Sequence, residues 1–231
     1  MGKDSFNMEA TMSQRQEARK TVLEAALKMV EKGLVIGTSG NISLRLNKQN
    51  ERQLIAITPT SRHYDTVRVN DIPIIDFDGQ NVEGRLAPSI ETPLHISIYR
   101  ARKDVNAIIH THSVFASAAA VAGLDIPVIM EDQAALLGGE IKLAAYALSG
   151  TPEQLTNVLG ALGNRNAVLL ANHGAVGMGQ TMRDAFTACE LIEKTARIYL
   201  LALATGKANK LPEKAREIQK ELYEKKQNDD E

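Results

Sequence analysis

Three short β-rich runs follow one another in the first third of the chain, and their spacing is the feature that most restricts the fold. They are NISLRL, QLIAITP and DIPIIDF, at residues 41–46, 53–59 and 71–77. The gap between the first two is too short for the helical crossover that parallel neighbours require. We therefore expect antiparallel pairing here, with strands at 41–45, 53–58 and 72–76.

Helical patterns surround these runs. Apolar residues recur at helical spacing from Gln14 to Lys32, and Gly33 follows as a plausible stop. The same criteria predict helices at 91–102, 114–123, 151–162 and 182–204, and strands at 105–112, 126–130 and on both sides of a turn at His173-Gly174 within 167–179. Together they predict an α/β fold of three layers, with a central, mostly antiparallel sheet and helices on both faces.

The domain organisation is expected to be simple. The 231 residues contain no internal repeat and no linker rich in Pro, Ser or Gly. We therefore expect a single domain over 1–231, with a core at about 14–204 and a C-terminal helix and charged tail at 211–231.

Composition excludes several classes of partner. The 27 basic and 28 acidic residues give a formal charge of -1, without the cationic excess of a nucleic-acid-binding protein. No window approaches the roughly 18 consecutive apolar residues of a membrane span, and the first residues lack the apolar stretch of a secretory signal. Cys189 is the only cysteine, so no intramolecular disulfide can form. We therefore expect a cytoplasmic protein, and small neutral or anionic ligands remain open.

The segment AIIHTHS, at residues 107–113, suggests metal chemistry. On a strand, His110 and His112 project from the same face, as two ligands of a transition metal do. Hydrogen-bonded histidines at a strand end are the alternative. A third histidine, His173, ends another apolar run just before a glycine that permits a sharp turn. Three histidines with an open fourth position are the usual composition of a catalytic zinc site.

The other two histidines are weaker candidates. His63, in TSRHYD, is expected in a loop. His95 falls one helical turn after Glu91, so it is expected to pack behind the site or support it rather than to be a ligand.

Four blocks in order, GTSGNISLR, ITPTS, APSIETPLHISIYRARKDVNAIIHTHS and LLANHGAVGMG, resemble the zinc-dependent class II aldolases of the fuculose-phosphate aldolase type. The superfamily also contains ribulose-phosphate 4-epimerase, methylthioribulose-phosphate dehydratase and the adducin head domain. The resemblance extends from about Gln14 to Leu203. It implies one Zn²⁺ per chain and a homotetramer with active sites at subunit boundaries.

The resemblance also implies roles for individual residues. His110, His112 and His173 become the zinc ligands. Glu91 becomes the acid/base carboxylate, which in the resting site can also coordinate the metal. A partner of the helix dipole is the alternative role for a glutamate at a helix start.

A phosphate pocket is implied on small and hydroxylic residues, whose backbone N–H groups can approach an anion closely. An ordinary turn is the alternative for GTSGN. The chain departs from the family where it carries Ile90 in place of a second serine. The implied phosphate ligands are Thr38, Gly40, Asn41, Thr60, Ser61 and Ser89.

A second departure falls at Glu131, where fuculose-phosphate aldolase has a tyrosine that reaches a neighbouring subunit's site as a proton donor. A carboxylic acid can transfer the same proton if burial raises its pKa. Methylthioribulose-phosphate dehydratases also place a glutamate near here, and a solvated acidic loop is the structural alternative. Tyr223, in the tail, is a further candidate that cannot be aligned.

The expected activity is reversible aldol cleavage of a ketose 1-phosphate to dihydroxyacetone phosphate and an aldehyde. Candidate substrates are fuculose 1-phosphate and related deoxy- or methylthio-pentulose phosphates. The dehydratase is one alternative. The 4-epimerase is another, although its members carry aspartate in place of Glu91. A non-catalytic, adducin-like scaffold is the third, although such domains lose the metal histidines that this chain keeps.

Overall fold

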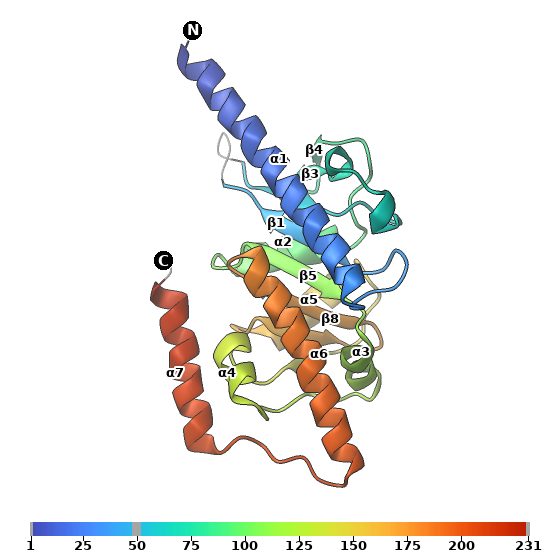
Figure 1. The fold of residues 1–231 in the computed structure, drawn as a ribbon, viewed down its shortest axis with the longest axis vertical. Helices are drawn as coiled ribbons and strands as arrows, with labels where there is room; N and C mark the ends of the chain where they lie inside the picture. Colours follow the sequence, from blue (N-terminus) through green and yellow to red (C-terminus); the bar gives the residue numbers. More distant parts are fainter. Residues whose placement is uncertain (1, 48–51, 230–231) are drawn as a thin grey trace.

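The computed structural model describes residues 2–47 and 52–229, and its described strands form one eight-stranded sheet in the order β4-β3-β2-β1-β5-β8-β7-β6 (Figure 1). All neighbours pair antiparallel except β6 and β7, which are parallel. The prediction of a mostly antiparallel sheet is therefore confirmed. The strands are β1 Asn41–Arg45, β2 Leu54–Ile57, β3 Ile74–Asp76, β4 Asn81–Glu83, β5 Ala107–Thr111, β6 Lys142–Ala144, β7 Ala167–Leu170 and β8 Gly174–Gly179.

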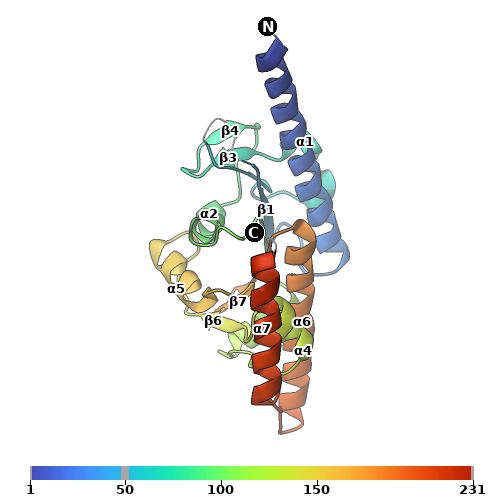
Figure 2. The ribbon, with the colours of Figure 1, turned by 90° about the vertical axis from the view of Figure 1, so that its left-hand side faces the viewer.

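Helices cover both faces of the sheet, as predicted. Figure 2 shows α2 and α5 on one side of the sheet and α1, α4, α6 and α7 on the other. Two short 3-10 helices, η1 Tyr64–Thr66 and η2 Val69–Asp71, follow β2. The α-helices are α1 Gly2–Glu31, α2 Thr92–Ala101, α3 Val114–Val121, α4 Glu131–Leu137, α5 Pro152–Leu162, α6 Met182–Ala204 and α7 Glu213–Asp229.

The central strand β5 separates the two halves of the core. Successive side chains of a strand point to opposite faces. Ile109 accordingly packs in the cluster formed with α1 and the start of α6, whereas Ile108 packs in the cluster formed with α2 and α5. His110 lies two residues after Ile108, so its side chain projects on the same face as α2.

Residues 126–130 do not form the predicted sheet strand. Ile126 makes only an isolated antiparallel bridge with Ile141. Pro127 has no N–H to donate to a ladder, and the N–H of Ile129 donates instead to Oε1 of Gln133 at 3.0 Å. Side-chain hydrogen bonding therefore replaces strand pairing in this segment.

Five short elements of the described residues were not predicted: the 3-10 helices η1 and η2, the strands β4 and β6, and the helix α4. β4 and β6 have three residues each, which is too few to show an alternating pattern. α4 directly follows the segment 126–130 and has seven residues. The N-terminal helix is also longer than predicted, because α1 begins at Gly2 rather than near Gln14. In contrast, α6 has the predicted bounds, and Thr181 and Asp184 form a capping box at its start.

Among the described residues, no helix is both long enough and apolar enough to cross a membrane.

Candidate metal centre and active site

The three predicted histidines meet at one end of the sheet. His110 occupies the penultimate position of β5, His112 follows that strand, and His173 ends the turn between β7 and β8. β5 and β8 are adjacent and antiparallel, which brings the end of the first strand to the start of the second. Nε2 of His110 lies 2.9 Å from Nε2 of His112 and 3.3 Å from Nε2 of His173.

This cluster fits a metal ion. One ligand atom from each of the three histidines lies within 4.8 Å of the others. Ligands of a tetrahedral zinc ion, with Zn–N distances near 2.0–2.1 Å, are separated by about 3.3 Å. The backbone oxygen of Ala175 lies 3.0 Å from Nδ1 of His110, so Nδ1 carries the proton and the Nε2 lone pair faces the cluster. Such a backbone partner is the usual support of a metal-binding histidine.

Glu91 completes the cluster from the start of α2, which packs on the sheet that carries the histidines. It is the N-cap residue of α2, but its side chain makes no capping hydrogen bond. Only 5% of Glu91 is exposed, and its Oε2 lies 3.2 Å from Nε2 of His110. Oε1 has no hydrogen-bond partner and lies 3.7 Å from Nε2 of His173. The carboxylate therefore faces the histidines rather than the helix N-terminus.

The charges of the site favour a cation. Burial opposes ionisation of Glu91, but His110, His173 and the Asn41 hydrogen bond outweigh it, so the pKa of Glu91 lies below its ordinary value. Burial, followed by the neighbouring imidazoles, lowers the pKa of His112 to about 4. Burial also lowers the pKa of His173. An anionic Glu91 beside neutral His112 and His173 matches the protonation state that a metal ion requires of its ligands.

Two of the segments predicted for phosphate binding lie side by side next to this cluster. Residues 58–60 pair with 87–89, because the N–H of Thr60 donates to Ala87 and the N–H of Ser89 donates to Thr58, both at 3.0 Å. Oγ of Ser89 accepts from the N–H of Glu91 at 3.3 Å. Ser61 is exposed and has a positive φ of 54°. Ile90, the departure from the family, is 72% exposed.

The third segment, GTSGN, supplies a turn and a buried side chain. Thr38 is exposed in the turn before β1. Gly40 has a positive φ of 72°, and a Cβ at this position would lie 2.7 Å from the backbone oxygen of His110. Nδ2 of Asn41 donates to Oε2 of Glu91 at 2.6 Å. The side chain of Asn41 is thus already engaged with the candidate catalytic carboxylate.

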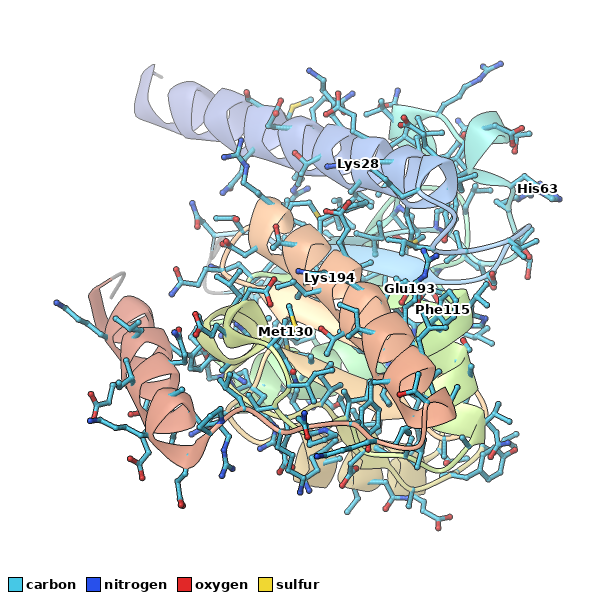
Figure 3. All side chains as sticks on the ribbon, turned by 60° about the horizontal axis from the view of Figure 1, so that its bottom comes forward. Lys28, His63, Phe115, Met130, Glu193 and Lys194 are labelled. Carbon is cyan, nitrogen blue, oxygen red and sulfur yellow. The ribbon has the colours of Figure 1, made fainter. Side chains whose placement is uncertain are left out.

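Glu131 does not join the cluster within one chain. It is the exposed first residue of α4, and within the part of the chain that the structure describes it makes no hydrogen bond or ion pair with the histidines. In Figure 3, its neighbour Met130 lies on the opposite side of α6 from Phe115, which lies in the first turn of α3, just after His112. Glu131 therefore lies at the start of a helix, and not in the acidic loop that was the structural alternative.

Tyr223 contacts α4 and the turn after α5, and not the histidines, within one chain. It is 5% exposed, and its hydroxyl donates to the backbone oxygen of Asn164 at 2.8 Å. A Cβ on Gly138, at the end of α4, would lie 2.7 Å from its ring. Within one chain Tyr223 therefore anchors α7 against α4.

A cavity of about 180 Å³ opens beside His173. One wall is the segment 144–149, which contributes alanines and the exposed side chains of Tyr146 and Leu148. Leu170 and Asn172, from the end of β7 and the turn after it, also line the cavity. The cavity next to the candidate metal centre therefore combines apolar side chains with polar groups from Ser149, Gln154 and Asn172.

Sequence analysis missed the polar residues that support the site. Ser43 and Tyr99 join His95 in buried hydrogen bonds. The available signal was their spacing: Ser43 shares a strand face with Asn41, and Tyr99 lies two helical turns after Glu91.

Comparison with known proteins gives a consistent family. The family model described as "Class II Aldolase and Adducin N-terminal domain" matches residues 20–200. Over 198 residues the chain is 36% identical to a 5-deoxy-D-ribulose 1-phosphate aldolase from Bacillus thuringiensis, covering 86% of this chain and 91% of the relative. It is 35% identical to an L-fuculose phosphate aldolase from Escherichia coli, covering 83% and 86%. A solved structure of an L-fuculose 1-phosphate aldolase matches with a TM-score of 0.84 at 34% identity, covering 90% and 96%.

Proposed function

The chain belongs to the family of class II aldolase and adducin N-terminal domains, and we propose that it catalyses the reversible, metal-dependent aldol cleavage of a ketose 1-phosphate. The products are dihydroxyacetone phosphate and an aldehyde. The observation that carries this proposal is the convergence of three histidine Nε2 atoms with the unpartnered Oε1 of Glu91. Relatives named as aldolases of sugar 1-phosphates support it.

We further propose that the ion is zinc, one per chain, held by His110, His112 and His173. Nitrogen ligands of this type favour zinc over magnesium, which prefers oxygen. When bound, the ion supplies a Lewis acid that polarises the carbonyl of the substrate. Glu91 also lies close enough to His110 to serve as a resting ligand.

In the proposed mechanism, Glu91 moves the proton on carbon. In the direction of addition, its carboxylate removes a proton from the hydroxymethyl carbon of dihydroxyacetone phosphate. The electron pair left on that carbon forms the new bond to the aldehyde carbon. The aldehyde oxygen then takes a proton from Glu131 of a neighbouring subunit, and solvent returns both carboxyl groups to their starting states. Cleavage follows the same steps in reverse.

The proposed phosphate pocket consists of backbone N–H groups and hydroxyls in the segments around β1, β2 and the start of α2. It uses no fixed cation, as is common where glycine and small residues line the site. Asn41 can contribute only the amide hydrogen that Glu91 does not accept. The residues proposed to bind the phosphate are Thr38, Gly40, Asn41, Thr60, Ser61 and Ser89.

A substrate panel tests the reaction. We expect the zinc-loaded protein to release dihydroxyacetone phosphate from ketose 1-phosphates, measured by coupled reduction with NADH. Substrates whose aldehyde half ends in an apolar group are expected to be among those cleaved, because Tyr146 and Leu148 line the cavity beside His173. Formation of a dehydrated diketone phosphate, or of an epimerised sugar phosphate, without dihydroxyacetone phosphate would contradict the proposal.

The proposed assembly is a homotetramer with each active site at a subunit boundary. It is supported by the position of Glu131 and by exposed apolar side chains on the surface of α3 and α6, namely Val114, Val121 and Leu201. Light scattering at micromolar concentration is expected to give the mass of four chains. A monomer under these conditions would overturn this proposal and the role of Glu131 in another subunit's site.

A further inference from the structure

A chain of buried polar side chains runs behind Glu91, away from the histidine cluster. Asn41 donates to Glu91 as described, and its Oδ1 lies 2.6 Å from Nε2 of His95. Nδ1 of His95 lies 2.7 Å from Oγ of Ser43, which lies 2.8 Å from the hydroxyl of Tyr99. His95, Ser43 and Tyr99 are fully buried, and Asn41 is 4% exposed.

The direction of every hydrogen bond in this chain is determined. The Glu91 carboxylate only accepts, so Asn41 must present its amide nitrogen to Glu91 and its oxygen to His95. Nε2 of His95 therefore carries a proton. In the neutral ring Nδ1 then accepts from Ser43, so the Tyr99 hydroxyl donates to Ser43 at 2.8 Å in preference to the backbone oxygen of Asn106 at 3.3 Å. Each proton points toward Glu91, and such aligned hydrogen bonds polarise and strengthen one another.

His95 is held in the neutral form that this direction requires. Burial lowers its pKa to about 3. A positively charged ring would also present a second N–H to Ser43 and reverse the hydrogen bonds beyond it.

The geometry follows from two matching periods. Glu91, His95 and Tyr99 are spaced by four residues along one face of α2, which corresponds to about 6 Å per step. Asn41 and Ser43 are spaced by two residues on one face of β1, which corresponds to about 7 Å. Residues of α2 and β1 therefore alternate along the chain of hydrogen bonds. In the register between β1 and β5, Asn41 is the partner of His110.

We propose that His95 is a positioning residue, which fixes the Asn41 amide and through it holds the Glu91 carboxylate with Oε1 facing the histidine cluster. This inference rests on the proposed function for its catalytic consequence. Its structural basis is independent of activity: without His95, Asn41 can rotate its amide, and Glu91 loses the donor that fixes Oε2.

The test compares His95→Leu with His95→Gln. Leucine fills the space but cannot donate to Asn41, whereas glutamine places an N–H near the position of Nε2. In the leucine variant kcat is expected to fall about 10–100-fold, the usual cost of losing a group that orients a metal-site residue. His95 is fully buried and cannot contact the substrate, so any change in KM should come through the proposed phosphate ligand Asn41 and be much smaller than the change in kcat. Glutamine should restore most of kcat.

A spectroscopic measurement provides a readout without turnover. The hydrogen bond from Asn41 to Glu91 is short and charge-assisted, so its amide proton should resonate far downfield. The resonance can be assigned by its loss in Asn41→Ala. It is expected to shift upfield in His95→Leu and to return in His95→Gln. The control is Ser97→Ala on the same helix, whose hydroxyl bonds only to Leu94 in the same turn and whose loss should change neither quantity.

Several results would overturn the inference. These are an unmoved Asn41 resonance in His95→Leu, wild-type kcat in that variant, or a folded His95→Gln enzyme as impaired as the leucine variant. If His95→Leu does not fold, Ser43→Ala serves instead, because it removes the donor to Nδ1 of His95. An unmoved Asn41 resonance in Ser43→Ala would also contradict the inference. A wild-type protein that cleaves no ketose 1-phosphate refutes the proposed function, while the resonance still tests the positioning.

Discussion

A His110→Ala, His112→Ala double variant is expected to lose both its metal and its turnover. Elemental analysis should find about one divalent ion per chain in the purified wild-type protein and close to none in the variant, because a single remaining histidine cannot hold the ion. Release of dihydroxyacetone phosphate should fall to the limit of detection. Added zinc should not restore it.

The matched control for this variant is His63→Ala. His63 is exposed at the edge of the molecule, just before η1 (Figure 3), and has no proposed role. Its variant should keep wild-type metal content and rate. An unchanged metal content in the double variant, with the fold verified by circular dichroism, would show that the ligand assignment is wrong.

Glu91→Gln is expected to separate proton transfer from metal binding. Asn41 donates to the position of Oε2, so it should select the amide oxygen there and leave the –NH₂ group facing the histidines. That group can neither accept a proton nor bind a metal ion. Turnover should fall by about 10²–10⁴-fold, the range for losing a general acid/base, while the three histidines keep zinc near full occupancy.

Metal content and rate must be measured on the same sample of this variant. The matched control is Glu153→Gln in the first turn of α5, where the side chain is exposed. If Glu91→Gln loses its metal and added zinc restores much of the rate, Glu91 is chiefly a ligand. Full activity in a metal-replete variant would contradict its catalytic role and transfer that role to Glu131.

Sequence patterns predicted the elements that carry strong periodicity. Strand β5 and the bounds of α6 follow from apolar runs, and the histidine pair follows from the two-residue period of a strand. By contrast, β6 is too short to show a period. Residues 126–130 are apolar enough for a strand, but the backbone there bonds to the side chain of Gln133. An apolar pattern does not show that a nearby side chain will take the backbone N–H that a strand would need.

The candidate site shows the same division. The convergence of Glu91 with the three histidines was expected only from the family resemblance, since it depends on how α2 packs on β1 and β5. The hydrogen bonds of Asn41 were not expected, because residues 41 and 91 are far apart in the sequence and only the register between α2 and β1 brings them together. The roles assigned to Glu131 and to the phosphate-binding residues remain predictions.

The most direct test of the central claim is release of dihydroxyacetone phosphate from a ketose 1-phosphate by the same protein before metal removal, after metal removal and after zinc is restored. The account predicts cleavage by the native protein, no detectable cleavage by the stripped protein, and recovery of most of the rate at about one zinc ion per chain. Undiminished cleavage after complete removal of metal from the histidine cluster would contradict it.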